Sequence, residues 1–446
     1  MTPRHLVSEV KARLRGASPS TFARLMYAYR GARALGEGLR SAAVGTPAKF
    51  LEPIAPPEPV RSRFPDIRLN LLIPTIEVGR SFGGVNTALE FWRALSARCP
   101  NVRLVTFDAP HVEATSLAEA SGYTLVSPGE ESRAPRQITY LGGPALRSRL
   151  GVGPSDLFIG TFWRTALAGQ ALVAWQAREF GVEPRPLTYL IQDFEPGFYP
   201  WSDEYVLADS TYTSENPTYA IFNSTTLQEY FNANRYRFAR EYAFEPQLNR
   251  ALAQRLESLR GSPKIRSVLI YGRPNSPRNA FGLIVDGLRL WQRRFPNARD
   301  WTISSAGEVH GDIALGKGVT IRNVGKLSLD GYTRLLAKSA VGVSLMVSPH
   351  PSYPPLEMAH FGVRVLSNSF ANKNLGSWHE NLTSLDVPSP ERLAESLCAL
   401  CSRYEADPTG GWTARSQMPH YLEAAEQFPF VDDLYRRLSD RVSIFA

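Results

Sequence analysis

A single carboxylate beside a proline-rich loop could bind a ligand that carries both an anionic group and a diol. Glu357 follows the Ser-Pro-His-Pro-Ser-Tyr-Pro-Pro segment 348–355, which separates the apolar run 341–347 from a short helix predicted over 356–361. Because proline fixes φ near −65° and lacks an N–H donor, this loop is stiff. Free N–H groups at the helix start can hold an anion at the carboxyl edge of a parallel sheet. Glu357, expected in the first turn, can accept hydrogen bonds from the diol.

A second group of acidic and aromatic residues follows an expected strand at 187–192. Asp193 and Glu195 are two residues apart, so extended backbone would direct both carboxylates to one side. Carboxylates accept hydrogen bonds from sugar hydroxyls, and flat rings cover the apolar face of a pyranose. The alternative is an aromatic loop packed at a domain edge, with both acids capping helices. The aromatic residues of this loop are Phe194, Phe198, Tyr199, Trp201 and Tyr205.

Expected strands alternate with helices along most of the chain, which favours parallel sheets covered by helices on both faces. A chain of 446 residues is too long for one core, so two large domains are expected. The strand-like runs occupy 66–75, 102–107, 137–141, 157–162, 187–192, 218–223, 266–271, 301–305, 319–324, 341–347 and 363–367.

The two motifs resemble those of a known family. The segments 348–359 (SPHPSYPPLEMA) and 189–200 (YLIQDFEPGFYP) are similar to retaining GT-B glycosyltransferases of family 4. They look most like bacterial rhamnosyltransferases of surface-glycan synthesis, such as that of O-antigen and S-layer glycans. The family signature has one Glu, seven residues and a second Glu. Glu357 stands at the second Glu, whereas Pro349 occupies the first position. The resemblance covers residues 66–446.

The resemblance implies an α/β protein of the GT-B fold, in which two doubly wound Rossmann-like domains face a central cleft. Residues 66–262 would form an N-terminal, acceptor-side domain, and 263–418 a C-terminal domain that binds a nucleotide sugar. Residues 419–446 would form a helix that crosses back to the first domain. Residues 1–65 are expected to be a basic helical extension that ends in the extended Pro-rich linker 51–65.

The resemblance also implies the donor-binding residues. Gly83 and Gly84 match a glycine-rich loop beside the donor phosphates, although glycine pairs also make plain turns. Arg273 and Arg278 stand where the family has two cations that hold the diphosphate; Arg278 replaces a lysine, and the alternative is two arginines in a surface turn. Glu357 would hold the ribose hydroxyls. The other residues expected at the donor are Gly307, Gly325, Lys326, Leu327, Ser352, Tyr353 and Pro354.

The implied reaction moves a sugar from a nucleoside diphosphate to a sugar hydroxyl with retention. The leaving diphosphate gains negative charge, so cations and backbone N–H groups would stabilise its departure, and the diphosphate itself would take the acceptor proton. Neither a metal nor a cofactor is expected besides the donor substrate, proposed as dTDP-L-rhamnose. The expected catalytic residues are Asp193, Arg273, Arg278 and Glu357, and the expected acceptor-binding residues are Trp163, Arg164, Asp193, Glu195, Phe198 and Tyr199.

The missing first Glu is the main departure from the family pattern. In the family this residue contacts hydroxyls of the donor sugar, so its loss suits a 6-deoxy sugar such as rhamnose, which offers fewer polar groups. His350 is close enough in sequence to take over part of that role. The alternative is that His350 is a loop histidine bonded to the backbone.

The net charge of +8 is concentrated at the start of the chain. Residues 1–50 hold nine Lys or Arg against two Asp or Glu, so the remainder is close to neutral, which argues against a nucleic-acid partner. Apolar spacing at 6–14 and 22–29 predicts two basic amphipathic helices. They either lie on an anionic membrane surface, where lipid-linked glycan acceptors are found, or pack on the first domain.

Cysteine usage and hydropathy indicate the compartment. The three cysteines fit a reducing environment, and Cys398 and Cys401 fall in a helical pattern without a second pair, which favours a packed helix over a metal site. No apolar run of about 18 residues occurs, and the N-terminus lacks the apolar core of a signal peptide. We therefore expect a cytoplasmic protein, peripheral on the inner membrane if the N-terminal helices bind lipid.

Two other functions fit the same patterns. A non-catalytic homologue that binds a nucleotide sugar or a glycan would explain the missing Glu and predicts donor binding without turnover. A nucleotide-sugar 2-epimerase of the GT-B fold predicts conversion of the donor without any acceptor. The aromatic loop and the basic N-terminal segment favour transfer over both.

Overall fold

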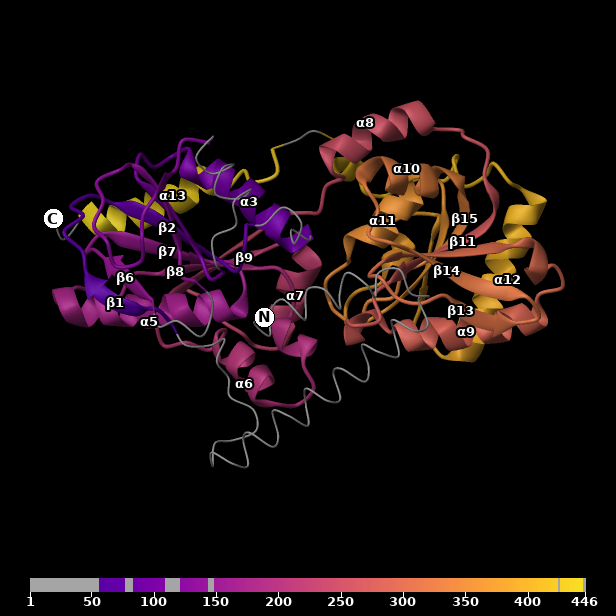
Figure 1. Ribbon diagram of the computed structural model, residues 1–446, viewed down its shortest axis with the longest axis horizontal. Coiled ribbons are helices and arrows are strands. Elements are labelled where there is room, and N and C mark those ends of the chain that lie inside the picture. Colours follow the sequence, from indigo (N-terminus) through magenta and orange to yellow (C-terminus); the bar gives the residue numbers. More distant parts are fainter. Residues whose placement is uncertain (1–55, 77–82, 109–120, 143–147, 424–425, 444–446) are drawn as a thin grey trace, which may run out of the picture.

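The computed structural model describes residues 56–76, 83–108, 121–142, 148–423 and 426–443, and the predicted N-terminal helices lie outside these ranges (Figure 1). Figure 1 shows two bodies side by side, each built around one sheet. No helix within the described ranges is both long and apolar enough to cross a membrane.

The first sheet has eight parallel strands in the order β10-β9-β8-β7-β2-β3-β5-β4. Most of its strands are apolar runs without a solvent face, as expected where helices cover both sides. The strands are β2 (Arg68–Ile73), β3 (Val102–Thr106), β4 (Thr124–Leu125), β5 (Arg136–Tyr140), β7 (Asp156–Gly160), β8 (Leu187–Ile191), β9 (Thr218–Phe222) and β10 (Arg240–Ala243).

Helices cover both faces of this sheet. Buried residues of α3 (Gly83–Ser96) and α13 (Val431–Ser443) share one apolar cluster, so the end of the chain packs on the first body (Figure 1). Helices α5 (Trp163–Phe180) and α7 (Thr225–Ala233) cover the opposite face. Helix α6 (Asp203–Ser210) follows the aromatic loop and begins at the capping side chain of Ser202.

The second sheet has seven strands in the order β13-β14-β12-β11-β15-β16-β17, and only the β13–β14 pair is antiparallel. Helices α9 (Phe281–Arg294) and α12 (Pro390–Ala406) cover one face, and α8 (Arg250–Leu259), α10 (Leu329–Lys338) and α11 (Tyr353–His360) the other. The strands are β11 (Ile265–Gly272), β12 (Thr302–Gly307), β13 (Ile313–Gly316), β14 (Val319–Gly325), β15 (Ser339–Val343), β16 (Arg364–Asn368) and β17 (Leu382–Leu385).

Three elements differ from the sequence-based expectation. The predicted extended linker contains a strand, β1 (Glu58–Arg61), which pairs with β6 (Arg149–Val152); a two-stranded sheet tolerates a proline on its edge. Helix α8 lies before the expected boundary at 262, yet its buried leucines pack with the second sheet. Helix α11 begins at Tyr353 instead of 356, because prolines are accepted in the first turn of a helix.

The CxxC pair lies in a packed helix, as the sequence indicates. Cys398 and Cys401 are free thiols in α12, and Cys401 is fully buried in the core between α12 and α9. Burial raises the pKa of the Cys401 thiol. Such a thiol behaves as a small apolar side chain.

A buried ionic network joins the starting ends of three neighbouring strands in the first sheet. Arg68 binds both oxygens of Asp156 with N–O distances of 2.7 and 2.8 Å, and Asn70 donates to the same carboxylate at 3.0 Å. Arg103 donates to the Asn70 side-chain oxygen at 2.7 Å. Burial alone would raise the pKa of the Asp156 carboxyl, but the two arginines hold it below its ordinary value. The network ties β2, β3 and β7 together.

We predict that Asp156→Asn lowers the free energy of unfolding by about 3–5 kcal/mol, because it leaves two buried arginines without their anion. Urea unfolding measures this loss. Asp286→Asn is the matched control, since Asp286 pairs with Arg289 at 2.8 Å on the solvent face of α9 and should cost about 0–1 kcal/mol. Equal losses in both variants would contradict the structural role of the network.

Candidate functional site

The candidate site lies where the carboxyl ends of the two sheets meet. Strand order reverses beside β2 and β7 in the first sheet and beside β11 and β15 in the second. Ligands of open α/β sheets bind outside the carboxyl ends of the strands at such switch points. The predicted donor and acceptor residues on the β2, β7, β8, β11 and β15 connections therefore reach the same region from two domains.

One ion pair joins the domains across this region. Arg278, in the short 3-10 turn η3 (Pro277–Asn279), donates to Asp193 of the first domain at 2.9 Å. The other Asp193 oxygen accepts the Ser348 hydroxyl, also from the second domain. The carboxylate of Asp193 is nearly buried, so its charge is matched by these donors instead of by water. Residues 85 and 155 positions apart in the chain thus form one polar contact.

Arg278 is also held by an aromatic ring. Its guanidinium carbon lies 3.9 Å from the centre of the Phe198 ring, and Phe198 ends the 3-10 turn η2 (Glu195–Phe198) of the aromatic loop. A cation over an aromatic face is attracted by the ring quadrupole. The Arg278 Nε atom is buried and has no hydrogen-bond partner within the described chain. The described residues therefore leave the hydrogen-bonding capacity of this donor unused.

Arg273 occupies the turn after β11. Its Nε donates to Glu308 at 3.2 Å, and the other Glu308 oxygen accepts the Asn275 backbone N–H at 2.9 Å. Gly307 allows this arrangement, since its φ is +138° and an added Cβ would lie 2.5 Å from the Gly272 carbonyl oxygen. The two predicted cations are therefore each paired with a carboxylate, Arg273 within its own domain and Arg278 across the cleft.

The starts of two helices meet at the same place. The Tyr353 hydroxyl in the first turn of α11 lies 3.5 Å from the Thr87 hydroxyl of α3. A Cβ added to Gly83 would lie 3.9 Å from the Tyr353 ring, and one added to Gly84 would lie 3.1 Å from the Gln192 side chain. Ser352, just before α11, has a φ of +69°, which L side chains rarely adopt. Two helix N-termini thus face each other between the domains, and both favour negative charge.

Glu357 lies one turn deeper in α11 than the sequence predicts, because this helix starts at Tyr353. The Tyr332 hydroxyl of α10 donates to its carboxylate at 2.7 Å. Burial raises the pKa of Glu357, and the Tyr332 hydrogen bond opposes that rise. The Tyr332 hydroxyl contacts one of the two carboxylate oxygens, so Glu357 is oriented while it keeps capacity to accept from a diol.

The remaining predicted donor residues surround this centre. Gly325 ends β14 with a φ of +63°, Lys326 is exposed after it, and Leu327 packs partly on the α8–α10–α11 cluster. Pro354 is half-buried in the first turn of α11. These positions lie at the carboxyl end of β14 or the start of α11, on the same edge of the sheet as Arg273.

His350 combines features of both sequence interpretations. Its Nδ1 accepts the Ser352 backbone N–H at 3.1 Å, as a loop histidine would. Its Nε2 is buried without a partner in the part of the chain that the structure describes. Burial lowers the pKa of His350 to about 4, so the ring is neutral at pH 7. With Nδ1 as the acceptor, Nε2 carries the proton and can donate to a ligand oxygen.

Two residues predicted to bind the acceptor, Trp163 and Glu195, are buried in the first domain instead. Trp163 is fully buried and Glu195 is 2% exposed, and the Trp163 backbone N–H donates to the Glu195 carboxylate at 2.5 Å. Tyr189 donates to the same carboxylate at 3.0 Å. A 3-10 turn begins at Glu195, so the two carboxylates of this loop do not share one side as extended backbone would require. Glu195 caps α5, and only Asp193 reaches the second domain.

The other acceptor candidates lie around these buried residues. The Trp163 indole N–H donates to the Tyr199 hydroxyl at 3.0 Å and orients that ring, while Arg164 lies against the indole at 5.1 Å. Phe198 and Tyr199 are half-buried beside Asp193. Trp163 therefore packs beneath the acceptor loop, and the half-buried Phe198 and Tyr199 form its more accessible side, next to the buried Asp193.

Sequence reasoning missed several residues of the site. Ser348 bonds Asp193, and Lys373 is fully buried with its ammonium group 2.6 Å from the Met346 carbonyl oxygen. Burial lowers the pKa of Lys373 to about 7. Asn372 donates to the Thr226 carbonyl oxygen of the first domain at 2.8 Å. No sequence motif marks these residues, because their roles arise only from long-range contacts.

An exposed aromatic pair extends the acceptor side. The Trp201 and Tyr205 rings stack with centres 5.3 Å apart, and Trp201 is 92% exposed. Both belong to the aromatic loop singled out from the sequence. Within the described residues, no group of three or more His, Cys, Asp or Glu side chains could hold a metal ion.

Structural neighbours identify the fold class. The chain is similar to sucrose-phosphate synthase from Thermosynechococcus elongatus, with a TM-score of 0.51 at 15% identity over 85% of this chain and 100% of that one. It is similar to an apo structure of OtsA, with a TM-score of 0.51 at 9% identity over 83% of this chain and 99% of that one. At such identities the likeness concerns the fold alone. The protein has the GT-B fold, with two Rossmann-like α/β domains.

Two protein-family models and one relative are similar to this chain in sequence. Residues 68–225 match the model described as WsaF, N-terminal domain, and residues 266–398 match WsaF, C-terminal domain. The chain therefore matches both WsaF domain models, in that order. It is also 32% identical over 327 residues to the O-antigen biosynthesis protein RfbC of Myxococcus xanthus. The match covers 72% of this chain but only 23% of that relative.

We predict that Glu195→Gln removes a pH dependence of stability. Burial raises the pKa of Glu195 from 4.5 to about 8, although the Tyr189 and Trp163 hydrogen bonds oppose it. The folded state therefore holds this proton more tightly than the unfolded state. Its contribution to stability is complete below pH 4.5 and is lost as the pH rises through 8.

Urea unfolding between about pH 5 and about pH 9 checks this prediction. The Glu195→Gln variant should show a smaller decline than the unchanged protein and be at least as stable at the alkaline end, because glutamine still accepts the Trp163 N–H. Glu395→Gln, at a surface carboxylate paired with Arg392, is the control and should keep the full decline. An unchanged decline in Glu195→Gln would show that Glu195 is already ionised at neutral pH.

Proposed function

We propose that this chain is a glycosyltransferase that moves a sugar from a nucleoside diphosphate to a hydroxyl of a bacterial surface glycan. The observation that carries the proposal is the contact of Asp193 with Arg278 and Ser348 between the carboxyl edges of two Rossmann-like sheets. The GT-B neighbours, the two WsaF domains and the similarity to an O-antigen biosynthesis protein support the same activity.

The proposed donor site has positive potential for a diphosphate and a carboxylate for a diol. Arg273, Arg278 and the facing starts of α3 and α11 hold the phosphates, and Arg278 exchanges part of its contact with Asp193 for phosphate oxygens. Charge that develops on the leaving diphosphate is then stabilised by groups already in place. Glu357, oriented by Tyr332, accepts from the ribose hydroxyls. The nucleotide base then lies at the carboxyl ends of β12 and β14, beside Gly307, Gly325, Lys326 and Leu327.

Asp193 is the proposed link between donor and acceptor. It lies at the end of β8 beside Phe198 and Tyr199, so an acceptor sugar bound on these rings reaches the carboxylate that contacts Arg278. Release of Asp193 from Arg278 would free it to accept from an acceptor hydroxyl. The exposed Trp201–Tyr205 stack continues this surface and suits a second sugar of the acceptor chain.

The finer proposal is that dTDP-L-rhamnose is the donor and that transfer retains configuration. It is motivated by the resemblance of segments 189–200 and 348–359 to rhamnosyltransferases and by Pro349 at the position of the family's first Glu. The proline side chain there offers no acceptor to a sugar hydroxyl, which matches a 6-deoxy sugar. The neutral His350, with a free Nε2, supplies one donor in its place.

The proposal includes a cytoplasmic location and acceptors that are free or lipid-linked glycans. Residues 1–50, outside the described ranges, carry nine basic residues and two acidic ones, which suits contact with an anionic membrane surface. We propose no nucleic-acid partner.

We predict that dTDP and dTDP-L-rhamnose raise the melting temperature of the purified chain by several degrees. A ligand at about 100 times its Kd adds roughly 2.7 kcal/mol to the stability of the native state. Arg273→Ala and Arg278→Ala should each abolish the shift with pyrophosphate as well as with nucleotides. Arg289→Ala, on the outer face of α9, is the control and should leave it unchanged.

Glu357→Gln separates recognition of the diol from recognition of phosphate. It should weaken nucleotide binding about tenfold, because a charge-assisted acceptor is lost, while pyrophosphate binding stays the same. A shift with UDP or GDP compounds alone would refute the rhamnose donor but keep the glycosyltransferase. No shift with any nucleotide would refute the donor site and favour a glycan-binding protein.

We predict transfer that does not depend on a metal. Release of dTDP from dTDP-L-rhamnose should require a glycan acceptor and continue in the presence of EDTA, because arginines and helix N-termini supply the positive charge. NMR of the product reports the anomeric configuration and thereby tests retention. Conversion of the donor without acceptor would favour the 2-epimerase, and loss of activity in EDTA with recovery on adding Mg²⁺ would contradict metal independence.

A further inference from the structure

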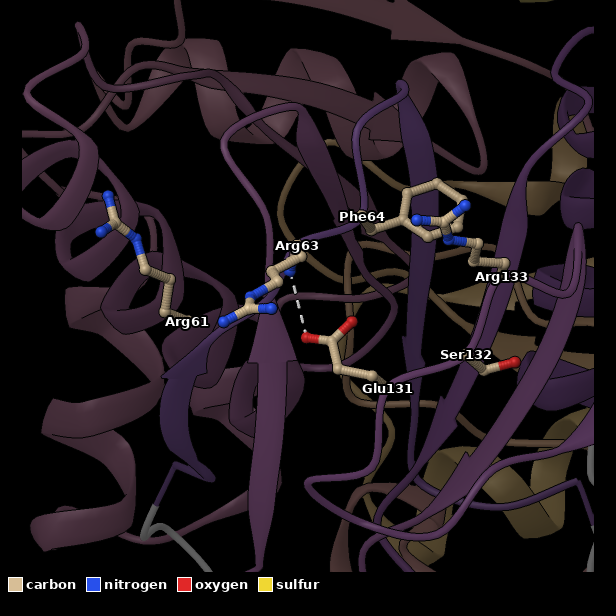
Figure 2. Close-up of a pocket in the computed structure, with 6 residues that line it drawn as sticks. All are labelled: Arg61, Arg63, Phe64, Glu131, Ser132 and Arg133. Atoms are coloured by element: carbon tan, nitrogen blue, oxygen red, sulfur yellow. Dashed lines mark hydrogen bonds between the residues drawn. The ribbon is translucent and has the colours of Figure 1, made fainter.

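A surface pocket of about 380 Å³ lies in the first domain, apart from the candidate site (Figure 2). Figure 2 shows Arg61 and Arg63 on one side of it and Arg133 on the other. Three guanidinium groups around one pocket are unusual in a body whose charge is otherwise close to neutral. The lining residues are Arg61, Arg63, Phe64, Glu131, Ser132 and Arg133.

The pocket lies at the end of the first sheet that is opposite the cleft. Arg63 and Phe64 come just before β2, and Glu131 to Arg133 come just before β5. These strands are parallel, so their starting ends lie together, and their carboxyl ends carry the candidate donor and acceptor residues. The pocket is therefore a site separate from the cleft, at the far side of the same domain.

Two of its three arginines have no partner for their charge. The side chains of Arg63 and Arg133 are exposed and make no ion pair or hydrogen bond with any described residue. Arg61 is partly engaged, by Glu179 at 3.6 Å and by the Phe180 ring at 4.9 Å, both at the end of α5. Two free guanidinium forks from separate chain segments can bind one phosphate group from two sides.

Glu131 organises the pocket and leaves it with an excess of positive charge. One of its carboxylate oxygens accepts the Arg63 backbone N–H at 3.1 Å, the dashed line in Figure 2, and the other accepts the Ser62 hydroxyl at 3.1 Å. Neither contact involves a guanidinium group, so Glu131 holds segment 62–63 in position. Each oxygen keeps a lone pair that can accept from a ligand hydroxyl.

The floor of the pocket is rigid. Phe64 is 5% exposed, and the guanidinium of Arg68 lies 4.4 Å from the centre of its ring. Arg68 is fixed in turn by the buried Asp156 network described above. The segment that carries Arg63 is thus attached to a buried, fully bonded network, and a preorganised pocket loses little entropy when a ligand binds.

We propose that this pocket binds a phosphate ester that carries hydroxyl groups. Arg63 and Arg133 hold the phosphate, Arg61 adds a third positive charge, and Glu131 accepts from a hydroxyl of the ester. A polyol phosphate has both features, either free in solution or as the headgroup of an anionic phospholipid. The site does not depend on the proposed transfer reaction, since it shares no residue with the cleft.

The first test is calorimetric titration of the full chain with glycerol 3-phosphate. The double variant Arg63→Gln/Arg133→Gln should bind at least tenfold more weakly, and Glu131→Gln should weaken glycerol 3-phosphate more than inorganic phosphate. Arg299→Gln/Arg392→Gln removes the same charge from the exposed surface of the second domain and should leave binding unchanged. All substituted side chains are exposed, and melting temperatures verify folding.

The second test separates the two sources of the ligand. Flotation with vesicles of phosphatidylcholine, with and without phosphatidylglycerol, compares the same two double variants, whose net charges are equal. Loss of phosphatidylglycerol binding only in Arg63→Gln/Arg133→Gln identifies a lipid headgroup, and loss only of glycerol 3-phosphate binding identifies a soluble ester.

The proposal is wrong if the Arg63→Gln/Arg133→Gln variant binds both ligands like its charge-matched control. It is equally wrong if glycerol 3-phosphate binding is lost in Arg273→Ala but kept in the pocket variant, because the ester would then occupy the cleft. Neither result affects the nucleotide titrations that test the proposed transferase, so failure of the two proposals can be distinguished.

Discussion

The contact of Arg278 with Asp193 is the interaction on which the geometry of the cleft depends. It is nearly buried, charge-assisted at 2.9 Å and supported by the Phe198 ring and the Ser348 hydroxyl. Such a pair is costly to break on one side only, because the remaining charge is left without water or partner. We propose that a diphosphate replaces Asp193 as the partner of Arg278, which would couple ligand entry to this contact between the domains.

Groups that favour an anion also lie along the carboxyl edges of both sheets. Parallel strands place all following turns at one edge, so Arg273, Arg278 and the start of α11 come together without being neighbours in sequence. The first domain adds the start of α3 and the aromatic loop. At the opposite edge, the Asp156 network stabilises the strand starts and supports the arginine pocket. The first domain thus borders the candidate site at one end and carries the arginine pocket at the other.

Local pattern was sufficient for most of the architecture. The β-branched runs, the prolines of 349–355 and the glycine pair at 83–84 each act on their own backbone, and the α/β alternation leads to the observed fold. The sequence pattern gave the wrong expectation where contacts between distant segments determine the structure. Strand β1 forms because β6 is there to pair with it, and α8 belongs to the second body because its leucines find an apolar surface there.

The sequence by itself determined the fold class, the segments that reach the cleft and the residue types able to hold phosphate and diol. Only the tertiary structure decided which of two carboxylates contacts the second domain: Asp193 meets Arg278, while Glu195 turns into the core to cap α5. It also introduced Ser348 and Lys373 and grouped Arg63 with Arg133. Backbone propensities act over a few residues, whereas charge pairing and burial act between surfaces that are adjacent only after folding.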